Sequence, residues 1–285
     1  MSGTSGTALL VTHTHPQNSS DGVKAAVAAA QEVGVELVAP EDEHRKHRGT
    51  VAGLGRAEEL KGDPSVCIVL GGDGSILYAL RRYADTGVPV FGINFGTIGF
   101  LAAVDREQID EGLRLAFAGE FEVMPMPALE MDMPSQRPVA FNDVTFTRRP
   151  HGRVAELSYC VSDEEVGNVR CDGLVVATPA GSTGYNLANA GPILAWGVEG
   201  YVVSFIAPHT LTARALVVAP DDRLKVINAA GRDPVDVALD GEHSAELTPG
   251  GEIEVSFRDG AGGLAQLPGA SFYTRMREKF GRLAT

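Results

Sequence analysis

The stretch from Val66 to Leu80, VCIVLGGDGSILYAL, constrains the fold more than any other part of the chain. Its first part, Val66–Leu70, is an apolar run typical of a buried strand, and Ser75–Tyr83 has the apolar spacing of a helix. The turn between them contains three glycines and one aspartate. A buried strand that leads directly into a helix is the repeating unit of a parallel sheet covered by helices.

The same alternation extends over the first 119 residues and predicts a Rossmann-like α/β domain with a mainly parallel sheet. The region from Glu41 to Gly62 is charged and ambiguous, with one helix expected near Ala57–Leu60. The other expected strands are Ala8–Val11, Val35–Val38 and Val88–Ile93, and the other expected helices are Ser20–Val33 and Arg106–Ala118.

After about Glu120 the pattern changes to many short apolar runs separated by Pro, Gly, Asp and Asn, which predicts a β-rich, sandwich-like second domain. One helix is expected within it, at Tyr185–Leu194, and a last helix at Ser271–Phe280 is expected to pack back on the first domain. The predicted domains are therefore residues 1–119 together with 270–285, and residues 120–269.

Composition excludes several classes of partner. The formal net charge of -13 argues against nucleic acid or an anionic membrane, because each attracts proteins of the opposite sign. An anionic small molecule stays possible, since backbone amides, helix N-termini or a metal ion supply local positive potential. The N-terminal residues lack the pattern of a signal peptide, so we expect a cytoplasmic protein. The histidines His13, His15, His44 and His47 and the basic cluster 45–48 are expected to be solvated.

The glycine turn Gly71–Gly74 is expected at the carboxyl end of a strand, where ligands of open α/β sheets collect. Glycines let backbone amides approach phosphate oxygens, but the carboxylate of Asp73 repels phosphate. Asp73 is explained if it binds Mg²⁺ through water or takes a proton from an attacking hydroxyl, two tasks of phosphoryl transfer. The alternative, that Asp73 only caps the helix in a tight turn, is equally compatible with these residues.

Further motifs follow along the chain. A second glycine turn, Asn94–Leu101 (NFGTIGFL), ends the next predicted strand, and two adjacent turns of this kind can enclose one phosphate chain. Asn142 and Asp143 interrupt an apolar run, and Asp172–Pro192 reads DGLVVATPAGSTGYNLANAGP. Arg81, on the helix after the first turn, is a further candidate for a phosphate contact.

Together with PHTLTARALVV at Pro208–Val218 and the pair Asp240–Gly241, these motifs make the chain resemble the NAD kinase family, whose members use ATP or polyphosphate. The resemblance implies the two-domain fold, transfer of a phosphoryl group to the 2′-hydroxyl of the adenosine ribose of NAD, a divalent cation such as Mg²⁺, and a homodimer or homotetramer. It implies that Asp73 is the catalytic carboxylate, and it names no protein ligand for the metal. The donor-binding residues would be Gly71, Gly72, Gly74, Ser75, Arg81, Asn94 and Gly96. The NAD-binding residues would be Asn142, Asp143, Asp172, Thr183, Gly184, Tyr185, Asn186 and Asp240.

The sequence departs from the usual family pattern at four places: Met126, Asp143 in place of Glu, Gly184 in place of Ala, and Ala190–Gly191. These departures leave open a kinase of the same fold that phosphorylates another hydroxyl, of a nucleoside, sugar or lipid. A sensor of NAD or NADP without catalysis is disfavoured by the intact Asp73. The phosphoryl donor, the choice between NAD and NADH, the oligomer size and feedback regulation are not determined by the sequence.

Overall fold

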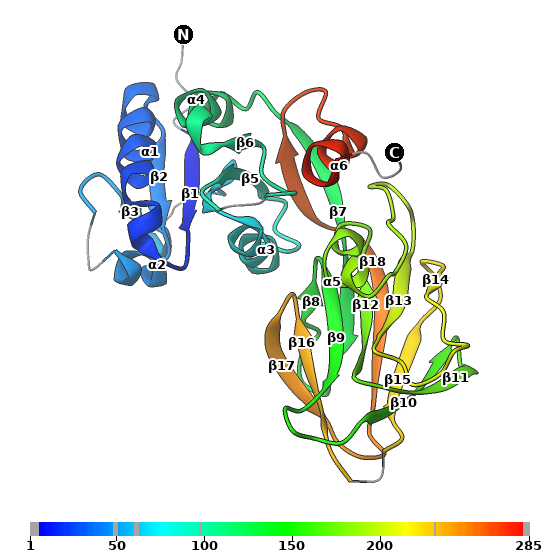
Figure 1. The fold of residues 1–285 in the computed structure, drawn as a ribbon. Helices are drawn as coiled ribbons and strands as arrows, with labels where there is room; N and C mark the ends of the chain where they lie inside the picture. Colours follow the sequence, from blue (N-terminus) through cyan, green and yellow to red (C-terminus); the bar gives the residue numbers. More distant parts are fainter. Residues whose placement is uncertain (1–5, 48–50, 60–62, 97–98, 231, 282–285) are drawn as a thin grey trace. The chain divides into compact units, whose positions relative to one another are not determined.

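The computed structural model describes residues 6–47, 51–59, 63–96, 99–230 and 232–281, and it divides into two compact units (Figure 1). The first unit comprises residues 1–125 and 262–285, and the second comprises residues 126–261. The predicted boundaries, 119/120 and 269/270, lie just outside the strands β7 (Glu122–Asp132) and β18 (Glu252–Gln266). The division falls inside both strands because each continues from one unit into the other.

The first unit is a parallel sheet with helices on both faces, in the strand order β18-β5-β4-β1-β2-β3. Its strands are β1 (Thr7–Thr12), β2 (Glu36–Ala39), β3 (Gly55–Arg56), β4 (Val66–Gly71), β5 (Pro89–Asn94) and the short β6 (Val104–Asp105). Its helices are α1 (Ser20–Val33), α2 (Glu41–Lys46), α3 (Asp73–Arg82), α4 (Ile109–Ala118) and α6 (Phe272–Phe280). The chain passes outward from β1 to β3 and then returns to the other side of β1 with β4, so the direction of the sheet order reverses between β1 and β4. Ligands of open α/β sheets bind at such a reversal, beyond the carboxyl ends of the strands.

Alternation along the central strands explains how both faces are covered. Leu10, Leu70 and Ile93 belong to a core shared with α1 and α4, whereas the neighbouring residues of each strand face the opposite side. On that side α3 packs so closely that a Cβ at Gly92 would lie 2.4 Å from Ile76 Cδ1. A side chain at position 92 would therefore require the Ile76 side chain to move.

Helix α1 begins and ends where its sequence predicts. Val23, Ala26, Val27 and Ala30 are buried at helical spacing, and Gly34 follows the helix in the left-handed conformation, φ 73°. By contrast, α2 forms in the region whose structure the sequence leaves ambiguous, and Ala57–Glu59 is only one 3₁₀ turn.

The second unit consists of two mainly antiparallel sheets that enclose one apolar core. One sheet has the order β14-β13-β12-β9-β16-β17, and the other contains β11, β10, β15 and β18, with β7 and β8 at its side. The bounds are β8 (Val139–Ala140), β9 (Asp143–Arg148), β10 (Ala155–Val161), β11 (Glu164–Cys171), β12 (Gly173–Ala177), α5 (Tyr185–Ala188), β13 (Tyr201–Ile206), β14 (Leu216–Val218), β15 (Leu224–Asn228), β16 (Val235–Leu239) and β17 (Glu242–Leu247). The predicted fold class is confirmed: a mainly parallel α/β unit, a β-rich unit and a C-terminal helix that belongs to the first unit.

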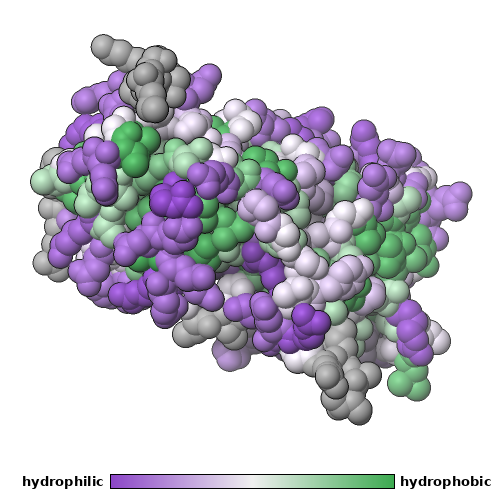
Figure 2. Space-filling model, turned by 90° about the horizontal axis from the view of Figure 1, so that it is seen from above, coloured by the Kyte–Doolittle hydropathy of each residue, from purple (hydrophilic) through white to green (hydrophobic). Residues whose placement is uncertain are grey.

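The surface agrees with an ordinary globular composition. Hydrophilic side chains cover most of the face seen in Figure 2, with hydrophobic side chains interspersed among them. None of the helices within the described residues reaches the length and hydropathy of a transmembrane segment.

Candidate functional site

The two glycine turns of the first unit lie against each other. Gly71 pairs with Asn94 at the ends of β4 and β5, and the amide of Phe95 donates to the carbonyl of Gly71 at 3.1 Å. A Cβ at Gly96 would lie 3.2 Å from the Cα of Gly72, so a side chain at position 96 would push the turns apart by a few tenths of an ångström. The predicted adjacency of the two turns is therefore confirmed for the described residues, whereas positions 97–98 of the second turn lie outside them.

Gly74 differs from these glycines because nothing in the fold requires it. A Cβ at Gly74 would meet nothing within 4 Å, and its φ is not positive. Gly74 is the second residue of α3, where glycine is a poor helix former, and it is exposed. Bare backbone at the exposed N-terminus of a helix is suited to a phosphate group, since the amides there have no partner within the helix.

Asp73 begins α3, and its carboxylate is bound by backbone amides rather than by solvent alone. The Phe100 amide lies 2.8 Å from Oδ2 and 3.0 Å from Oδ1, and the Leu101 amide lies 3.0 Å from Oδ1. Burial raises the pKa of Asp73 above its ordinary value of 3.8. The two amides, and then the charges of Arg275 and Lys279, oppose this rise.

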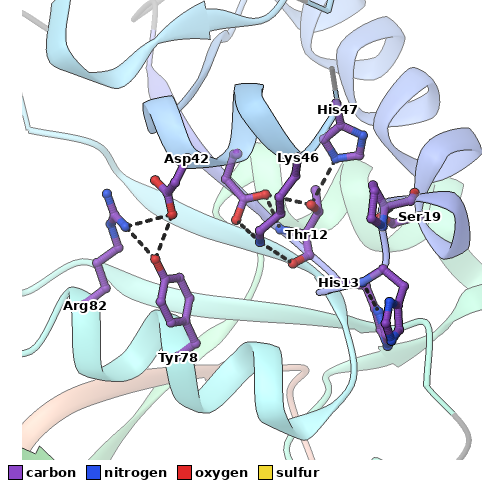
Figure 3. A network of polar contacts seen from close by, with 11 residues as sticks. Thr12, His13, Ser19, Asp42, Lys46, His47, Tyr78 and Arg82 are labelled. Atoms are coloured by element: carbon purple, nitrogen blue, oxygen red, sulfur yellow. Dashed lines mark hydrogen bonds and ion pairs between the residues drawn. The ribbon is translucent and has the colours of Figure 1, made fainter. Parts of the chain in front are cut away.

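A polar network connects the end of β1 to α2 (Figure 3). Glu43, only 1% exposed, accepts the Thr12 hydroxyl at 2.6 Å and the Lys46 ammonium at 2.7 Å. The amide of His13 donates to the carbonyl of Leu70 at 2.8 Å, which places His13 beside the first glycine turn. This edge of the sheet is therefore fixed by α2 as well as by the strand ladder.

Two predictions for this region are wrong. His44 is 1% exposed, with Nε2 3.0 Å from the carbonyl of Gly55, because α2 packs against the sheet. Lys46, expected in a solvated cluster, forms an ion pair with the buried Glu43. Arg48, the last residue of that cluster, lies outside the described residues.

The structure does not bring Arg81 to the glycine turn. Arg81 lies in the last turn of α3, eight residues after Asp73, which corresponds to about 12 Å along the helix. Ser75 is close instead: its amide donates to the Gly72 carbonyl at 3.0 Å, and its Oγ would be 2.4 Å from a Cβ at Gly71.

In the second unit, Asn142 and Asp143 lie in a segment fixed by the carboxylate of Asp240. That carboxylate accepts the amides of Phe141 at 3.1 Å, Asn142 at 2.7 Å and Asp143 at 3.2 Å. Asp240 has φ 48° and precedes Gly241 in the turn between β16 and β17. The turn role and the support of the Asn142–Asp143 segment are therefore properties of the same residue.

The side chains of Asn142 and Asp143 keep unused hydrogen-bonding capacity. Asn142 Oδ1 is buried and has no hydrogen-bond partner among the described residues. Asp143 is 7% exposed, and burial, followed by the nearby charge of Asp240, raises its pKa to about 7. An unpaired acceptor and a carboxyl that is partly protonated at neutral pH are suited to a ligand that offers both donors and acceptors.

The segment after β12 packs onto Asn142. Thr178 Oγ1 donates to the carbonyl of Phe141 at 2.6 Å, and the Thr178 amide donates to the carbonyl of Asn142 at 2.9 Å. A Cβ at Gly181 would lie 1.9 Å from the Asn142 carbonyl oxygen. Only glycine fits at position 181 without moving backbone.

The predicted ligand residues of this segment have different surroundings. Tyr185 is 42% exposed, so it is not a core residue, and Thr183 Oγ1 donates to the Ala180 carbonyl at 3.1 Å. A Cβ at Gly184 would meet the Gly181 carbonyl at 3.4 Å, an ordinary contact, so an alanine side chain has room there.

Asn186 is fully buried, and Nδ2 donates to the carbonyls of Ser182 and Pro192, both at 2.9 Å. Its amide group bridges the turn after the helix, and its Oδ1 is buried with no hydrogen-bond partner among the described residues. Helix α5 ends at Ala188 rather than at the predicted Leu194. The left-handed Ala190, φ 58°, and Gly191, packed against Asn186, follow the helix.

Asp172 lies at the opposite end of β12 from Asp143. Ala177 pairs with Asp143, so Asp172 is five residues, or about 17 Å, farther along the strand. Its carboxylate accepts Arg148 Nε at 2.6 Å, at the wall of a cavity of about 800 Å³ in the second unit. The structure therefore does not bring Asp172 together with Asn142 and Asp143 within one chain.

Several contributors to the site carry no signal in the sequence. The amides of Phe100 and Leu101 bind Asp73, and a backbone amide is the same in every residue other than proline. Arg275 and Gln266, which contact the segment containing these amides, lie far along the chain. The strand of Gln266 and the helix of Arg275 can be predicted from their patterns, but this contact cannot.

Comparison with known proteins gives a consistent result over most of the chain. Residues 17–121 match the ATP-NAD kinase N-terminal domain, and residues 141–261 match the ATP-NAD kinase C-terminal domain. The NAD kinase of Carboxydothermus hydrogenoformans is 35% identical over 74% of this chain and 78% of its own length. The NAD kinase of Symbiobacterium thermophilum is 35% identical over 76% of this chain and 79% of its own.

Solved structures agree with these sequence matches. An NAD kinase from Archaeoglobus fulgidus, solved in complex with ATP, superposes with a TM-score of 0.71 and 26% identity over 96% of this chain and 97% of that chain. Yeast NADH kinase, complexed with NADH, superposes with a TM-score of 0.83 over 98% of this chain and 89% of that chain, and its 18% identity supports the fold alone. The glycine turn with Asp73 and the family matches agree, and the chain belongs to the NAD kinase family.

Proposed function

We propose that this protein is an NAD kinase, which transfers a phosphoryl group from ATP or polyphosphate to the 2′-hydroxyl of the adenosine ribose of NAD and so forms NADP. The observation that carries the proposal is the carboxylate of Asp73, placed at the start of α3 between glycines and fixed by two amides. A fixed carboxylate beside bare backbone amides combines a proton acceptor with a site for phosphate, as this reaction requires.

Asp73 is the proposed catalytic residue, and its geometry leaves room for a substrate hydroxyl. An ionised carboxylate offers about four lone-pair positions. Oδ1 receives both amides, whereas Oδ2 receives only the Phe100 amide. Oδ2 can therefore accept the ribose hydroxyl and orient its oxygen toward the phosphorus atom. It can take the hydroxyl proton as the new oxygen–phosphorus bond forms and the bond from phosphorus to the bridging oxygen of the donor breaks, which releases ADP or the shortened polyphosphate.

The glycine turns are the proposed cradle for the phosphate groups of the donor. Gly72 and Gly96 bring two backbone segments together, and Gly74 leaves the N-terminus of α3 open. The amides there, with the positive end of the helix, stabilise negative charge on the phosphoryl group during transfer. Ser75 and Asn94 border the same turns, and Asn94 Oδ1 already accepts the Gly96 amide at 3.0 Å.

Asn142 and Asp143 are the proposed contacts to the adenosine part of NAD. The unpaired Oδ1 of Asn142 suits an amino group, which the adenine ring supplies. Asp143 can donate a hydrogen bond when protonated and accept one when ionised. Tyr185 is exposed and can lie along a ligand, whereas Asn186 and Asp240 act through the backbone that they support.

A divalent cation such as Mg²⁺ is proposed to accompany the donor. Mg²⁺ usually keeps several waters and is held largely by substrate phosphates, so no protein ligand is assigned to it here. The carboxylate of Asp73, at the glycine turns, can contact one of these waters. When bound, the ion would neutralise charge on the phosphate oxygens. The described residues place three possible metal ligands within 4.8 Å of one another at Asp236, His243 and Glu246, but Arg149 forms ion pairs with both acids there.

An assay of NADP formation tests the proposal. The purified protein with Mg²⁺ is supplied with ATP or polyphosphate as donor, and with NAD, NADH or a panel of nucleosides, sugars and lipids as acceptor. NADP formed from NAD with at least one donor supports the proposal. Turnover of another hydroxyl compound together with no product from NAD would contradict it. The predicted homodimer or homotetramer and the predicted cytoplasmic location stay predictions.

A further inference from the structure

The C-terminal helix α6 is linked to Asp73 through a short buried segment. Phe100, Leu101 and Ala102 are at most 8% exposed, and this segment contains both amides that bind the Asp73 carboxylate. Arg275 Nη1, on α6, donates to the carbonyl of Phe100 at 2.8 Å and to the carbonyl of Ala102. The helix therefore contacts the same backbone segment as Asp73, and both bind the peptide group between Phe100 and Leu101.

Gln266, at the end of β18, completes this arrangement. Its Nε2 donates to the carbonyl of Leu101 at 2.8 Å, and its Oε1 accepts Arg275 Nη2. Gln266 is 4% exposed, so its hydrogen bonds are made away from water, where they are stronger. The three successive carbonyls of residues 100–102 are thus all occupied by two side chains.

The aromatic contacts of the segment add packing to these hydrogen bonds. The Phe100 ring lies 5.8 Å from the Phe272 ring and 6.1 Å from the Phe280 ring, centroid to centroid. Phe272 begins α6 and Phe280 ends it. Both ends of the helix therefore pack on the residue whose amide binds Asp73.

One covalent detail connects the charge of Arg275 to that of Asp73. The carbonyl of Phe100 and the amide of Leu101 belong to the same planar peptide group. Arg275 donates to its oxygen, and its N–H donates to Asp73 Oδ1 at 3.0 Å. A cation on the oxygen polarises the group and makes its N–H a stronger donor toward the carboxylate.

We propose that Arg275, supported by Gln266, is a positioning residue for phosphoryl transfer, because it polarises the peptide group between Phe100 and Leu101, whose N–H binds Asp73, and fixes the backbone segment that carries both amides. The inference rests on the proposed role of Asp73. Arg275 touches neither substrate nor donor in this account, and its effect reaches the reaction only through Asp73.

Arginine is suited to this position because its planar group carries several donors in a fixed arrangement. Arg275 reaches two carbonyls and Gln266 at once, which the single ammonium of lysine cannot match with the same geometry. The charged groups that act on Asp73 are Arg275 and Lys279, both on α6, and those that act on Arg275 are Asp73, Glu278 and Asp105.

The test compares Arg275→Ala and Arg275→Lys with Arg277→Ala, an exposed arginine on the same helix that serves as the matched control. The titration of the Asp73 carboxyl carbon is followed by ¹³C NMR, assigned by its loss in Asp73→Asn. The amide signals of Phe100 and Leu101 are followed in the same samples. NADP formation is measured as a function of pH, with kcat and the KM for NAD determined separately.

We expect the pKa of Asp73 to rise in both Arg275 variants, the amide signals to move, and the acidic limb of kcat to shift to higher pH. At pH 7, kcat of Arg275→Ala should fall by roughly tenfold or more with the KM for NAD within about twofold, and Arg277→Ala should match the parent. If Arg275→Ala does not fold, Arg275→Lys carries the same comparison. An unchanged Asp73 titration in a folded Arg275 variant overturns the inference, as does a loss of kcat with no shift in its pH profile.

The NMR titration does not depend on turnover, so the two proposals can fail separately. A shifted Asp73 titration together with full activity of Asp73→Asn would remove the proposed function while the link to Arg275 remained. Loss of activity in Asp73→Asn together with an unshifted titration in Arg275→Lys would do the reverse.

Discussion

Two aspartates, the partly buried Asp73 and the buried Asp143, lie one in each unit and have opposite surroundings. The carboxylate of Asp73 accepts two backbone amides and is influenced by the positive charges of Arg275 and Lys279. The carboxylate of Asp143 has no hydrogen-bond donor among the described residues, and its charged neighbour is the carboxylate of Asp240. Burial raises the pKa of both groups, but only the first is compensated by donors and cations.

The comparison shows that two residues of the same type, Asp73 and Asp143, are suited to different roles because their surroundings differ. The donors and cations around Asp73 stabilise its ionised form, which is the form that accepts a proton in the proposed transfer. An uncompensated carboxylate is half protonated at pH 7 and can serve as either donor or acceptor to a bound ligand, which suits the proposed contact of Asp143 with adenosine. The carboxylate of Asp240 accepts all three amides of residues 141–143. None of these amides therefore donates to the carboxylate of Asp143.

The largest effect on stability is expected when Gly181, in the second unit, is replaced by alanine, and Gly74 in the first unit gives the comparison. In Gly181→Ala, the new Cβ would lie 1.9 Å from the Asn142 carbonyl oxygen, so backbone has to move. We expect the free energy of unfolding to fall by about 3 kcal/mol or more, as measured by denaturant unfolding.

The matched control is Gly74→Ala, where the new Cβ meets nothing within 4 Å. Its free energy of unfolding should stay equal or rise by up to about 1 kcal/mol, because alanine is the better helix former. NADP formation should nevertheless fall by roughly tenfold or more, because the methyl group occupies the proposed phosphate cradle. Full activity of Gly74→Ala would place the donor elsewhere.

Asp240→Asn tests the support of the Asn142–Asp143 segment. Asparagine tolerates the left-handed backbone at φ 48°, but its side chain is neutral and offers one oxygen to three amides. We expect a loss of about 2 kcal/mol in the free energy of unfolding and weaker binding of NAD, by calorimetry. The pKa of Asp143 should fall below its present value of about 7, because the negative charge beside it is gone. An unchanged Asp143 titration would show that burial alone sets its pKa.

Asp143→Asn has an effect that depends on pH. The folded-state pKa of about 7 lies above the ordinary value of 3.8, so the unfolded chain loses this proton first. The contribution of Asp143 to the free energy of unfolding therefore falls as the pH rises from about 4 to about 7, and it stays at its lowest value above that.

The neutral amide that replaces the Asp143 carboxyl avoids this cost, although its own burial offsets part of the gain. Relative to the parent, we expect the variant to be more stable by about 1–2 kcal/mol at pH 8 and to lose this advantage at pH 4. A stability difference that stays constant between these pH values would mean that Asp143 is ionised in the folded protein throughout, and that its pKa is not raised by burial.

Tyr78→Phe has the smallest expected effect. It tests whether the contacts between α3 and α2 influence the position of Asp73 at the start of α3. The Tyr78 hydroxyl donates to Asp42 Oδ2 at 2.9 Å and receives Arg82 Nη1 at 2.6 Å, in a partly exposed network between α2 and α3 (Figure 3). Its removal should lower the free energy of unfolding by about 0.5–1 kcal/mol and leave kcat unchanged. A large loss of kcat would show that the position of Asp73 depends on this end of the helix.

Much of the fold follows from patterns that lie close together in the sequence. Helix α1 coincides with its predicted residues, and β4 and α3 lie within one or two residues of theirs, because apolar spacing and glycine turns are local signals. The strands β11 and β17 are absent from the prediction, since EEVGNVRC and EHSAEL are mostly polar, exposed strands at the edges of their sheets. The sequence predicts two strands, Glu252–Phe257 and Gly263–Leu267, in place of the long β18, and Asp259 and Gly260 between them resemble a turn.

Some residues of the candidate site can likewise be predicted from local sequence patterns, and others cannot. Asp73, the two glycine turns and the pair Asn142–Asp143 can be found from residue types at strand ends. The burial of Asn186 and the separation of Asp172 from Asp143 depend on how the segments after and before β12 pack, which residue type does not determine. The link from Arg275 to Asp73 passes through backbone atoms 173 to 175 residues away in the sequence, so no local pattern contains it.

The most direct test of the account is the rate of the chemical step in Asp73→Asn, measured by rapid quench with saturating NAD, donor and Mg²⁺. Asparagine keeps the size of the side chain but cannot accept the hydroxyl proton as a carboxylate does. We expect a loss of about 10²–10⁴-fold in this rate, with binding of NAD by calorimetry close to that of the parent. A rate within a few-fold of the parent, in a variant that is folded and binds NAD, would contradict the role given to Asp73.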